Sequence, residues 1–372
     1  MKLYMKIDFV KLKRQYDMYA SEYEEAVLRA MRSGWYILGK EMMEFEERFS
    51  NYLGMDYCIG VNCGLDALVL AVRALEIGSG DEVIVPANTY IASVLGITEN
   101  GAVPVFVEPD AYFCLDADKI EEAITEKTKA ILPVHFYGQA CNMRKICEIA
   151  ERHHLYVIED CAQSHGAIHD GQVTGTFGTI GCFSFYPTKP MGALGDAGAL
   201  VTNDPAIAER LRKLRNYGSR KKYVNELTGT NSRLDELQAA VLKVSLKYVD
   251  EGNDYRRRIA DMYLNGIHNP FVKLPETLDK NYHVYHVFAL LCKQRDKLQQ
   301  HLLKQGVHTL IHYPIPPHMQ QCYKSLGHKE GDFPISEAYA VWELSLPIYV
   351  GMPDQEVKYV IDVVNSFQGE SS

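Results

Sequence analysis

Several features that mark large classes of protein are missing from this sequence of 372 residues. No stretch approaches the roughly 18 consecutive apolar residues needed to span a membrane, and the first residues lack the apolar core of a signal peptide. The nine cysteines are scattered without a CxxC pair, which favours free thiols in a reducing compartment over a disulfide framework. The sequence therefore predicts a cytoplasmic protein with no membrane partner.

Positive charge is also scarce. Lys and Arg number 39 against 48 Asp and Glu, and the formal net charge is -9, so no broad basic face is available for nucleic acid. The exception is a cluster of basic residues between Arg212 and Lys222. A local patch of this kind suits a small anionic ligand, although a solvated helix end would carry the same charges. We expect no nucleic-acid partner.

Internal repeats and low-complexity segments are absent too, and apolar strands alternate with helices over the first 250 residues. Strands are expected at 56–61, 82–86, 103–107, 130–135, 155–158, 180–185 and from 199. Helices are expected at 19–50 with a break at 33–34, at 67–75, up to 99, and at 119–127, 143–153 and 204–215. This alternation predicts an α/β domain with a mainly parallel sheet covered by helices on both faces.

A smaller C-terminal unit is expected after a long helix that runs from 231 to about 265. The domain change is placed within that helix, which gives a large domain over 1–250 and a small α+β domain over 251–372. The small domain is expected to contain strands at 284–292 and 308–312, and helices at 296–305, 335–342 and 353–367. The segment 221–230 has no periodicity and is expected to be a long loop.

Four groups of candidate residues follow the carboxyl ends of expected strands: the turn at Gly64, Tyr90, the acids Glu159 and Asp160, and Lys189. Ligands of such sheets bind beyond these strand ends. The turn at 62–66 opens a helix, whose free N–H groups and dipole favour an anion. It matches neither GxGxxG nor the Walker pattern, so a single phosphate group is the expected ligand. The coincidence of these groups predicts one binding site.

Lys189 lies in a loop between Pro187 and Pro190, and three glycines follow. These residues favour a fixed loop over a helix. A lysine held there can be desolvated, which favours the free amine, as a Schiff base with a carbonyl cofactor requires. From this loop alone, an ordinary surface lysine on a turn fits equally well.

Other candidates have two interpretations each. Asp160 could hold a protonated pyridine nitrogen, but a strand-end aspartate is more often a cap or turn residue. His283 and His286 would point to opposite faces of a strand, which argues against a metal pair. In the proline-rich turn 312–318, His312 and His318 could line a substrate pocket or be solvated.

A set of motifs runs in fixed order over nearly the whole chain. They lie at 35–40, 62–68, 86–90, 133–138, 159–166, 184–198, 231–240 and 312–318. In this order and spacing the sequence resembles the DegT/DnrJ/EryC1/StrS family of sugar aminotransferases, which use pyridoxal 5'-phosphate. The resemblance implies an aspartate-aminotransferase-like fold of type I, and a homodimer with active sites at the subunit interface.

The resemblance also implies roles for single residues. Lys189 would form the Schiff base with the cofactor and shuttle protons, and Asp160 would pair with the pyridine nitrogen. Gln163 would contact the ring hydroxyl, and Tyr90 would stack on the ring. The residues expected at the phosphate are Gly64, Leu65, Ser184 and, from the other subunit, Asn231.

Two segments depart from the usual family pattern. The loop at 195–198 reads Gly-Asp-Ala-Gly instead of Gly-Glu-Gly-Gly, which resembles the branch that aminates C3 of dTDP-linked 3-keto-6-deoxyhexoses. The turn at 62–65 reads Asn-Cys-Gly-Leu where Ser-Gly-Thr is commoner, so the phosphate depends more on backbone N–H groups. Both weigh towards transfer of the amino group of L-glutamate to such a sugar, giving a 3-amino-3,6-dideoxyhexose for a deoxysugar pathway.

The diphosphate of the sugar nucleotide is expected at the basic loop. The candidate residues there are Tyr217, Arg220, Lys221, Lys222 and Tyr223, with His312 and His318 as further candidates for the substrate. Two alternatives stay open: a C4 aminotransferase on a UDP- or dTDP-linked 4-keto sugar, and a catalytically silent regulator that binds a metabolite. A dehydratase on the same fold would carry histidine in place of Lys189.

Overall fold

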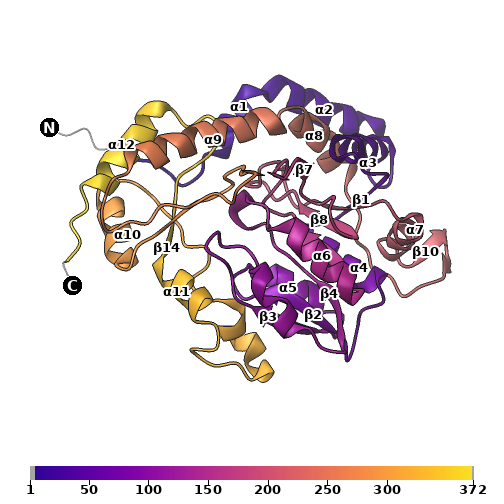
Figure 1. Cartoon of the computed structure of the whole chain (residues 1–372). Helices are drawn as coiled ribbons and strands as arrows, with labels where there is room; N and C mark the ends of the chain where they lie inside the picture. Colours follow the sequence, from indigo (N-terminus) through magenta and orange to yellow (C-terminus); the bar gives the residue numbers. More distant parts are fainter. Residues whose placement is uncertain (1–4, 371–372) are drawn as a thin grey trace.

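A seven-stranded sheet forms the centre of the larger lobe in the computed structural model, which describes residues 5–370 (Figure 1). The strand order is β1-β9-β8-β5-β4-β2-β3. The strands are β1 (Tyr57–Val61), β2 (Glu82–Pro86), β3 (Val103–Val107), β4 (Thr128–Ile131), β5 (Tyr156–Asp160), β8 (Ile180–Ser184) and β9 (Gly198–Thr202). β9 runs antiparallel to both of its neighbours, and the other pairs are parallel. The mainly parallel sheet is therefore confirmed.

Helices cover both faces of this sheet. α4 (Gly64–Ala74), α5 (Ile91–Thr98) and α7 (Pro205–Leu214) pack on one face. α3 (Lys40–Leu53), α6 (Met143–His153) and α8 (Glu236–Lys247) pack on the other face. In β1, Ile59 lies in the first apolar cluster and Cys58 in the second. Because both faces are buried, each central strand contains a short apolar run, and this makes the strands easy to find in the sequence.

The C-terminal part of the chain builds a second apolar core. It is formed by α9 (Val249–Gly266), α10 (Arg295–Lys304), α12 (Asp354–Asn365), β13 (Phe288–Leu291) and β14 (Glu343–Leu346). Ile7 also belongs to this core and pairs with Val307. In Figure 1, α12 and α9 lie side by side. The chain passes from α8 to α9 at Tyr248, and the domain division placed near residue 250 stays a prediction.

Shorter elements complete the description of the chain. The helices are α1 (Leu12–Met18), α2 (Ala20–Ser33) and α11 (Pro334–Trp342), with short 3-10 segments at η3 (Phe136–Gly138), η4 (Pro317–Met319) and η5 (Gln321–Leu326). The strands are β6 (Ile168–His169), β7 (Gln172–Val173) and β12 (Asn281–Tyr282). Across residues 5–370, no helix combines the length and the apolar character needed to cross a bilayer.

Several predicted elements are wrong in type or extent. The helix expected at 119–127 is two single turns, η1 (Ala117–Lys119) and η2 (Glu121–Ala123), because β4 begins at Thr128 and the segment has no apolar stripe long enough for a helix. The helix expected from 231 begins at Glu236 and is broken at Tyr248. Residues with high helix propensity occur throughout both segments, so propensity alone predicted helices where the structure has breaks.

The predicted β structure of the C-terminal part also differs. The strand expected at 284–292 is shorter in the structure and is β13 alone, because Tyr285, with a φ of 47°, interrupts extended backbone at the start of the predicted range; β12 lies just before that range. The strand expected at 308–312 is a single bridge between Leu310 and Ser345. The loop expected at 221–230 contains part of a small hairpin, β10 (Ser219–Lys221) and β11 (Val224–Asn225).

Candidate active site

A cavity of about 550 Å³ lies at the carboxyl ends of the central strands. The large lobe lines it with residues that follow β1, β2, β5 and β8, and the C-terminal part adds His286, His312 and Tyr313. The predicted turn at Gly64, Tyr90, Asp160 and Lys189 all lie in its wall. The structure thus brings together the groups that the strand-end argument selects.

Lys189 lies in the loop that joins β8 to β9. Its backbone N–H donates to the carbonyl of Tyr186 at 2.8 Å, which closes a tight turn. The side chain lines the cavity. Burial lowers the pKa of Lys189 to about 8, and the negative charge of Asp160 limits this fall. Far more of this amine is therefore uncharged near neutral pH than of an ordinary lysine, and the uncharged form can act as a nucleophile.

Asp160 ends β5 and is 5% exposed. The hydroxyl of Ser93 donates to Oδ2 at 2.8 Å, and the backbone N–H of Ala162 donates to Oδ1 at 3.1 Å. Burial raises the pKa of this carboxyl group, and these two bonds and the charge of Lys189 oppose the rise. The carboxylate is thus held in one orientation at the cavity wall, as a partner for a protonated ring nitrogen must be.

Ser93 is a residue that the sequence analysis missed. It lies in the first turn of α5, and its hydroxyl also bonds that of Thr89, four positions earlier, at 2.8 Å. A pattern in the sequence could have identified Ser93: two hydroxyl-bearing residues lie four positions apart directly after the end of a strand. Tyr313 was missed as well; its ring centre lies 4.9 Å from that of Tyr90.

Gln163 is held by its neighbour Tyr137. Its side-chain oxygen accepts a hydrogen bond from the backbone N–H of Tyr137 at 2.7 Å, and Gln163 itself lines the cavity. This bond fixes which side of the amide faces the protein, so the amide nitrogen is left as a donor for the cavity.

The start of α4 forms the second wall of the cavity. Gly64 packs so closely on Ser184 that a Cβ at position 64 would lie 2.5 Å from the Cβ of Ser184. Glycine therefore lets the helix end reach Ser184, and Leu65 follows in the first turn. The first N–H groups of a helix have no carbonyl partner within it, and they carry its positive dipole end. The pairing of this helix end with a serine hydroxyl suits a phosphate.

Other predicted residues lie away from this cavity. His318 is 1% exposed and bonds Glu337 at 3.1 Å, outside the cavity lining. Asn231 pairs with Asn216 beside the hairpin of β10 and β11. The candidates on or next to that hairpin, also outside the lining, are Tyr217, Arg220, Lys221, Lys222 and Tyr223. Tyr223 is 87% exposed. Within a single subunit the structure does not unite them with Lys189.

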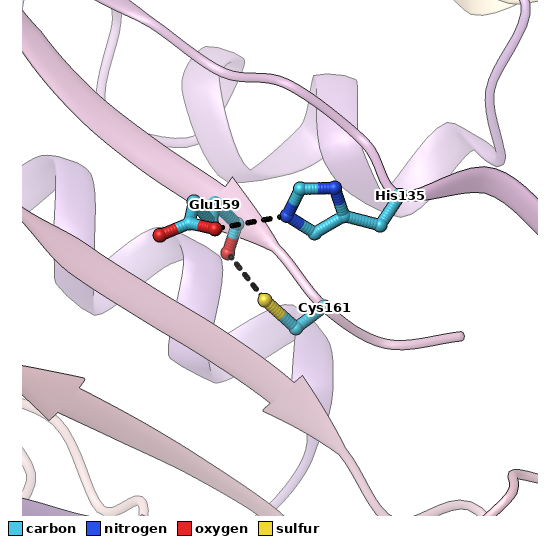
Figure 2. A group of neighbouring side chains, drawn as sticks. All are labelled: His135, Glu159 and Cys161. Atoms are coloured by element: carbon cyan, nitrogen blue, oxygen red, sulfur yellow. Dashed lines mark hydrogen bonds and ion pairs between the residues drawn. The ribbon is translucent and has the colours of Figure 1, made fainter. Parts of the chain in front are cut away.

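Glu159 faces the opposite side of β5 from Asp160 and belongs to a separate buried cluster. Figure 2 shows the ring of His135 against its carboxylate, at 2.9 Å, and the sulfur of Cys161 near its backbone oxygen. The backbone N–H groups of residues 175, 177 and 178 also donate to the carboxylate. The backbone N–H of Cys141 donates to Nδ1 of His135. Because these polar atoms satisfy one another, we assign the cluster a structural role that anchors the end of β5.

A profile of the DegT/DnrJ/EryC1/StrS aminotransferase family matches residues 18–365. The chain belongs to this family. One relative of this aminotransferase is named dTDP-3-amino-3,6-dideoxy-alpha-D-galactopyranose transaminase and comes from Aneurinibacillus thermoaerophilus. It is 52% identical over 362 residues, which are 97% of this chain and 99% of the relative.

Solved structures of similar proteins have the same fold. DesV of S. venezuelae, solved in complex with a ketimine intermediate, gives a TM-score of 0.95 at 46% identity over 97% of this chain and 98% of DesV. NtdA of Bacillus subtilis, solved with bound cofactor PMP, gives 0.88 at 31% identity over 96% of this chain and 85% of NtdA. The aminotransferase therefore has fold type I and depends on pyridoxal 5'-phosphate.

The cavity fits this cofactor. Lys189 has an amine that would suit its aldehyde, and the buried carboxylate of Asp160 would suit its ring nitrogen. The close approach of Gly64 to Ser184 leaves a helix end and a hydroxyl for its phosphate. In each of the three cases the functional group of the protein is chemically complementary to the group of the cofactor.

Proposed function

We propose that this aminotransferase moves the amino group of L-glutamate to C3 of a dTDP-linked 3-keto-6-deoxyhexose, giving a 3-amino-3,6-dideoxyhexose. The observation that carries the proposal is the 52% identity, over 97% of the chain, to a transaminase whose name specifies a 3-amino-3,6-dideoxy sugar linked to dTDP. The loop at 195–198, which departs from the usual family pattern, supports the same branch.

We propose the following roles for the residues of the cavity. Pyridoxal 5'-phosphate, when bound, supplies an aldehyde that carries the amino group and a ring that takes up electrons. The amine of Lys189 holds the cofactor and moves a proton to and from C3 of the sugar. Asp160 keeps the ring nitrogen protonated, Gln163 donates to the ring hydroxyl, and Tyr90 covers one face of the ring. Gly64, Leu65 and Ser184 bind the phosphate.

We further propose that the enzyme is a cytoplasmic homodimer with shared active sites. Apolar side chains are exposed on the Lys189 loop and near the start of α3, where a second subunit could cover them. They are Trp35 (64% exposed), Tyr36 (52%), Met43 (57%), Tyr186 (53%) and Leu194 (59%). A partner in this position would let Asn231 and the basic hairpin of one subunit serve the cavity of the other.

The decisive experiment offers the purified enzyme two separate substrates with L-glutamate: a dTDP-3-keto-6-deoxyhexose and a dTDP-4-keto-6-deoxyhexose. We expect amination of the first, with the nitrogen located on C3 by NMR of the product, and no product with Lys189→Ala. Nitrogen on C4 would support the C4 aminotransferase instead. A protein that binds pyridoxal 5'-phosphate but aminates neither sugar would support the regulator.

A further inference from the structure

Two polar side chains, Ser345 and Glu343, lie behind His312 and form a hydrogen-bonded chain with it outside the cavity lining. Nδ1 of His312 lies 2.8 Å from Oγ of Ser345, and Ser345 Oγ donates to Oε1 of Glu343. The other carboxyl oxygen of Glu343 accepts the backbone N–H of His312 at 2.6 Å. Ser345 is 0% and Glu343 1% exposed. One buried carboxyl group therefore holds His312 by its backbone and, through Ser345, by its ring.

Two neighbouring polar side chains bond the backbone of this chain and not its side chains. The hydroxyl of Tyr137 donates to the carbonyl oxygen of His312. Arg295, the charged neighbour of Glu343, donates to the backbone carbonyl of Glu343 at 3.1 Å, not to the carboxyl group. Without a bonded cation, burial raises the pKa of Glu343 to about 8. Both forms of the carboxyl group are then accessible near neutral pH.

The ionised and the protonated form of Glu343 place the ring proton of His312 on different nitrogens. An ionised Glu343 accepts from the hydroxyl of Ser345, whose oxygen accepts from Nδ1–H, so Nε2 carries a lone pair. A protonated Glu343 donates to Ser345, whose hydroxyl then donates to Nδ1, so Nε2 carries the proton. Among the described residues Nε2 has no hydrogen-bond partner, and His312 lines the cavity.

We propose that Glu343 and Ser345 are positioning residues that set the tautomer of His312, and so decide whether its Nε2 accepts or donates a hydrogen bond in the cavity. The acceptor form fits the reaction. Lys189 lines the same cavity and carries N–H groups, and an acceptor at Nε2 complements these donors. An acceptor can bind that amine or a hydroxyl of the sugar.

The titratable groups that face the ring itself are few. Lys189 and His286 line the same cavity, and Tyr313 follows His312 in the chain. Burial and the charge of Lys189 lower the pKa of His312 to about 4. Burial also holds the pKa of His286 well below its usual value and raises that of Tyr313. Both imidazoles are therefore neutral, and tautomer rather than charge distinguishes the states of His312.

The sharpest variant is Glu343→Gln. Its amide oxygen still accepts the backbone N–H of His312, but its NH2 group must donate to Ser345, which locks the proton on Nε2 at every pH. Ser345→Ala breaks the chain, and Ser345→Thr keeps a hydroxyl in it. The matched control is Glu337→Gln, because Glu337 also bonds a histidine, His318 at 3.1 Å, but outside the cavity lining.

The direct readout is the 15N chemical shift of labelled histidine, with the His312 signal identified by its loss in His312→Gln. In the wild type, between about pH 6 and about pH 10, Nε2 should change from a protonated to an unprotonated nitrogen as the pH rises through about 8. Glu343→Gln should stay protonated at Nε2, and Ser345→Thr and Glu337→Gln should follow the wild type. A wild-type titration in folded Glu343→Gln would overturn the proposal.

Kinetics give a second, independent readout, which rests on the proposed function for its substrate. Above about pH 8, kcat/KM of Glu343→Gln for the keto sugar should be lower than that of the wild type by about tenfold. Below that pH the two enzymes should converge, because both then present a donor. A ratio that does not change with pH would contradict the proposal. If the wild type fails to aminate the sugar, the proposed function fails, and the NMR titration still tests the tautomer.

Discussion

At the scale of single residues, the active site depends on groups that burial holds away from their usual protonation behaviour. Lys189 and Asp160 lie in the same cavity wall, and each shifts the other: the carboxylate favours the ammonium and the ammonium favours the carboxylate. Burial opposes both charges. The result is an amine that is easily deprotonated beside an acid whose pKa is raised.

The pH dependence of cofactor capture follows from Lys189. Only the uncharged amine reacts with an aldehyde, and its pKa is lowered to about 8. The rate at which apoenzyme captures added pyridoxal 5'-phosphate should therefore rise with pH and level off above about 8, well below the 10.5 of an ordinary lysine. Stopped-flow absorbance measures this rate. Asp160→Asn removes the charge that favours the ammonium, so its inflection should move to lower pH; a move to higher pH would contradict the assignment.

The orientation of Asp160 should depend on Ser93. Ser93→Ala removes a hydrogen bond to a buried carboxylate, a loss of about 1.5–3 kcal/mol for a bond to a charged group. We expect the Kd for pyridoxal 5'-phosphate to rise by about tenfold or more, as measured by absorbance titration of apoenzyme. Ser79→Ala, at an exposed position, is the control. An unchanged Kd would show that the Ala162 N–H alone suffices to hold the carboxylate.

At the scale of elements, strand ends were predictable and the basic hairpin was not. The central strands are apolar on both faces, so length and composition reveal them. The hairpin of β10 and β11 has no such run: its two strands have three and two residues, only Val224 among them is apolar, and none is buried. The prediction of a helix at 119–127 was wrong for a related reason. The charged residues of this segment have high helix propensity, but they do not indicate an apolar face that packs on the sheet.

The hairpin should contribute to binding of the nucleotide sugar. Lys221 and Lys222 are exposed and lie at the tip of the hairpin. The double change Lys221→Gln and Lys222→Gln should raise the KM for the nucleotide sugar by about tenfold, with a smaller effect at high salt, because remote ion pairs with a diphosphate are screened. The KM for L-glutamate should stay the same. If steady-state kinetics show an unchanged KM for the sugar, the diphosphate binds elsewhere.

At the scale of the whole molecule, the site is assembled from parts far apart in sequence. β1, β5 and β8 of the large lobe meet His312 and Tyr313 of the C-terminal part. The sequence analysis could place each strand-end group, because parallel topology alone brings those together. It could not place Ser345 or Glu343 behind His312, since no local pattern links a loop residue to residues of a strand about thirty positions later.

If active sites are shared between subunits, mixing two inactive variants should restore part of the enzyme activity. Lys189→Ala and Asn231→Ala should each lose activity as homodimers. In a mixed dimer, one cavity combines the intact Lys189 of one subunit with the intact Asn231 of the other. Denaturing and refolding an equal mixture should recover about a quarter of the wild-type rate, because about half of the dimers are mixed and each has one intact site. Recovery to no more than the mean of the two separate variants would contradict a shared site.

The pairing of Ile7 with Val307 has a consequence for how the polypeptide is made. The backbone of Ile7 accepts from His308 at 2.9 Å and donates to Gly306 at 2.8 Å, so the segment around Ile7 has no pairing partner until the chain has been synthesised some three hundred positions further. The strands of the central sheet all lie between these two partners in the sequence. A nascent chain halted after α8 should already hold a compact sheet, whereas the segment around Ile7 should remain open to protease until Val307 and its neighbours have been added.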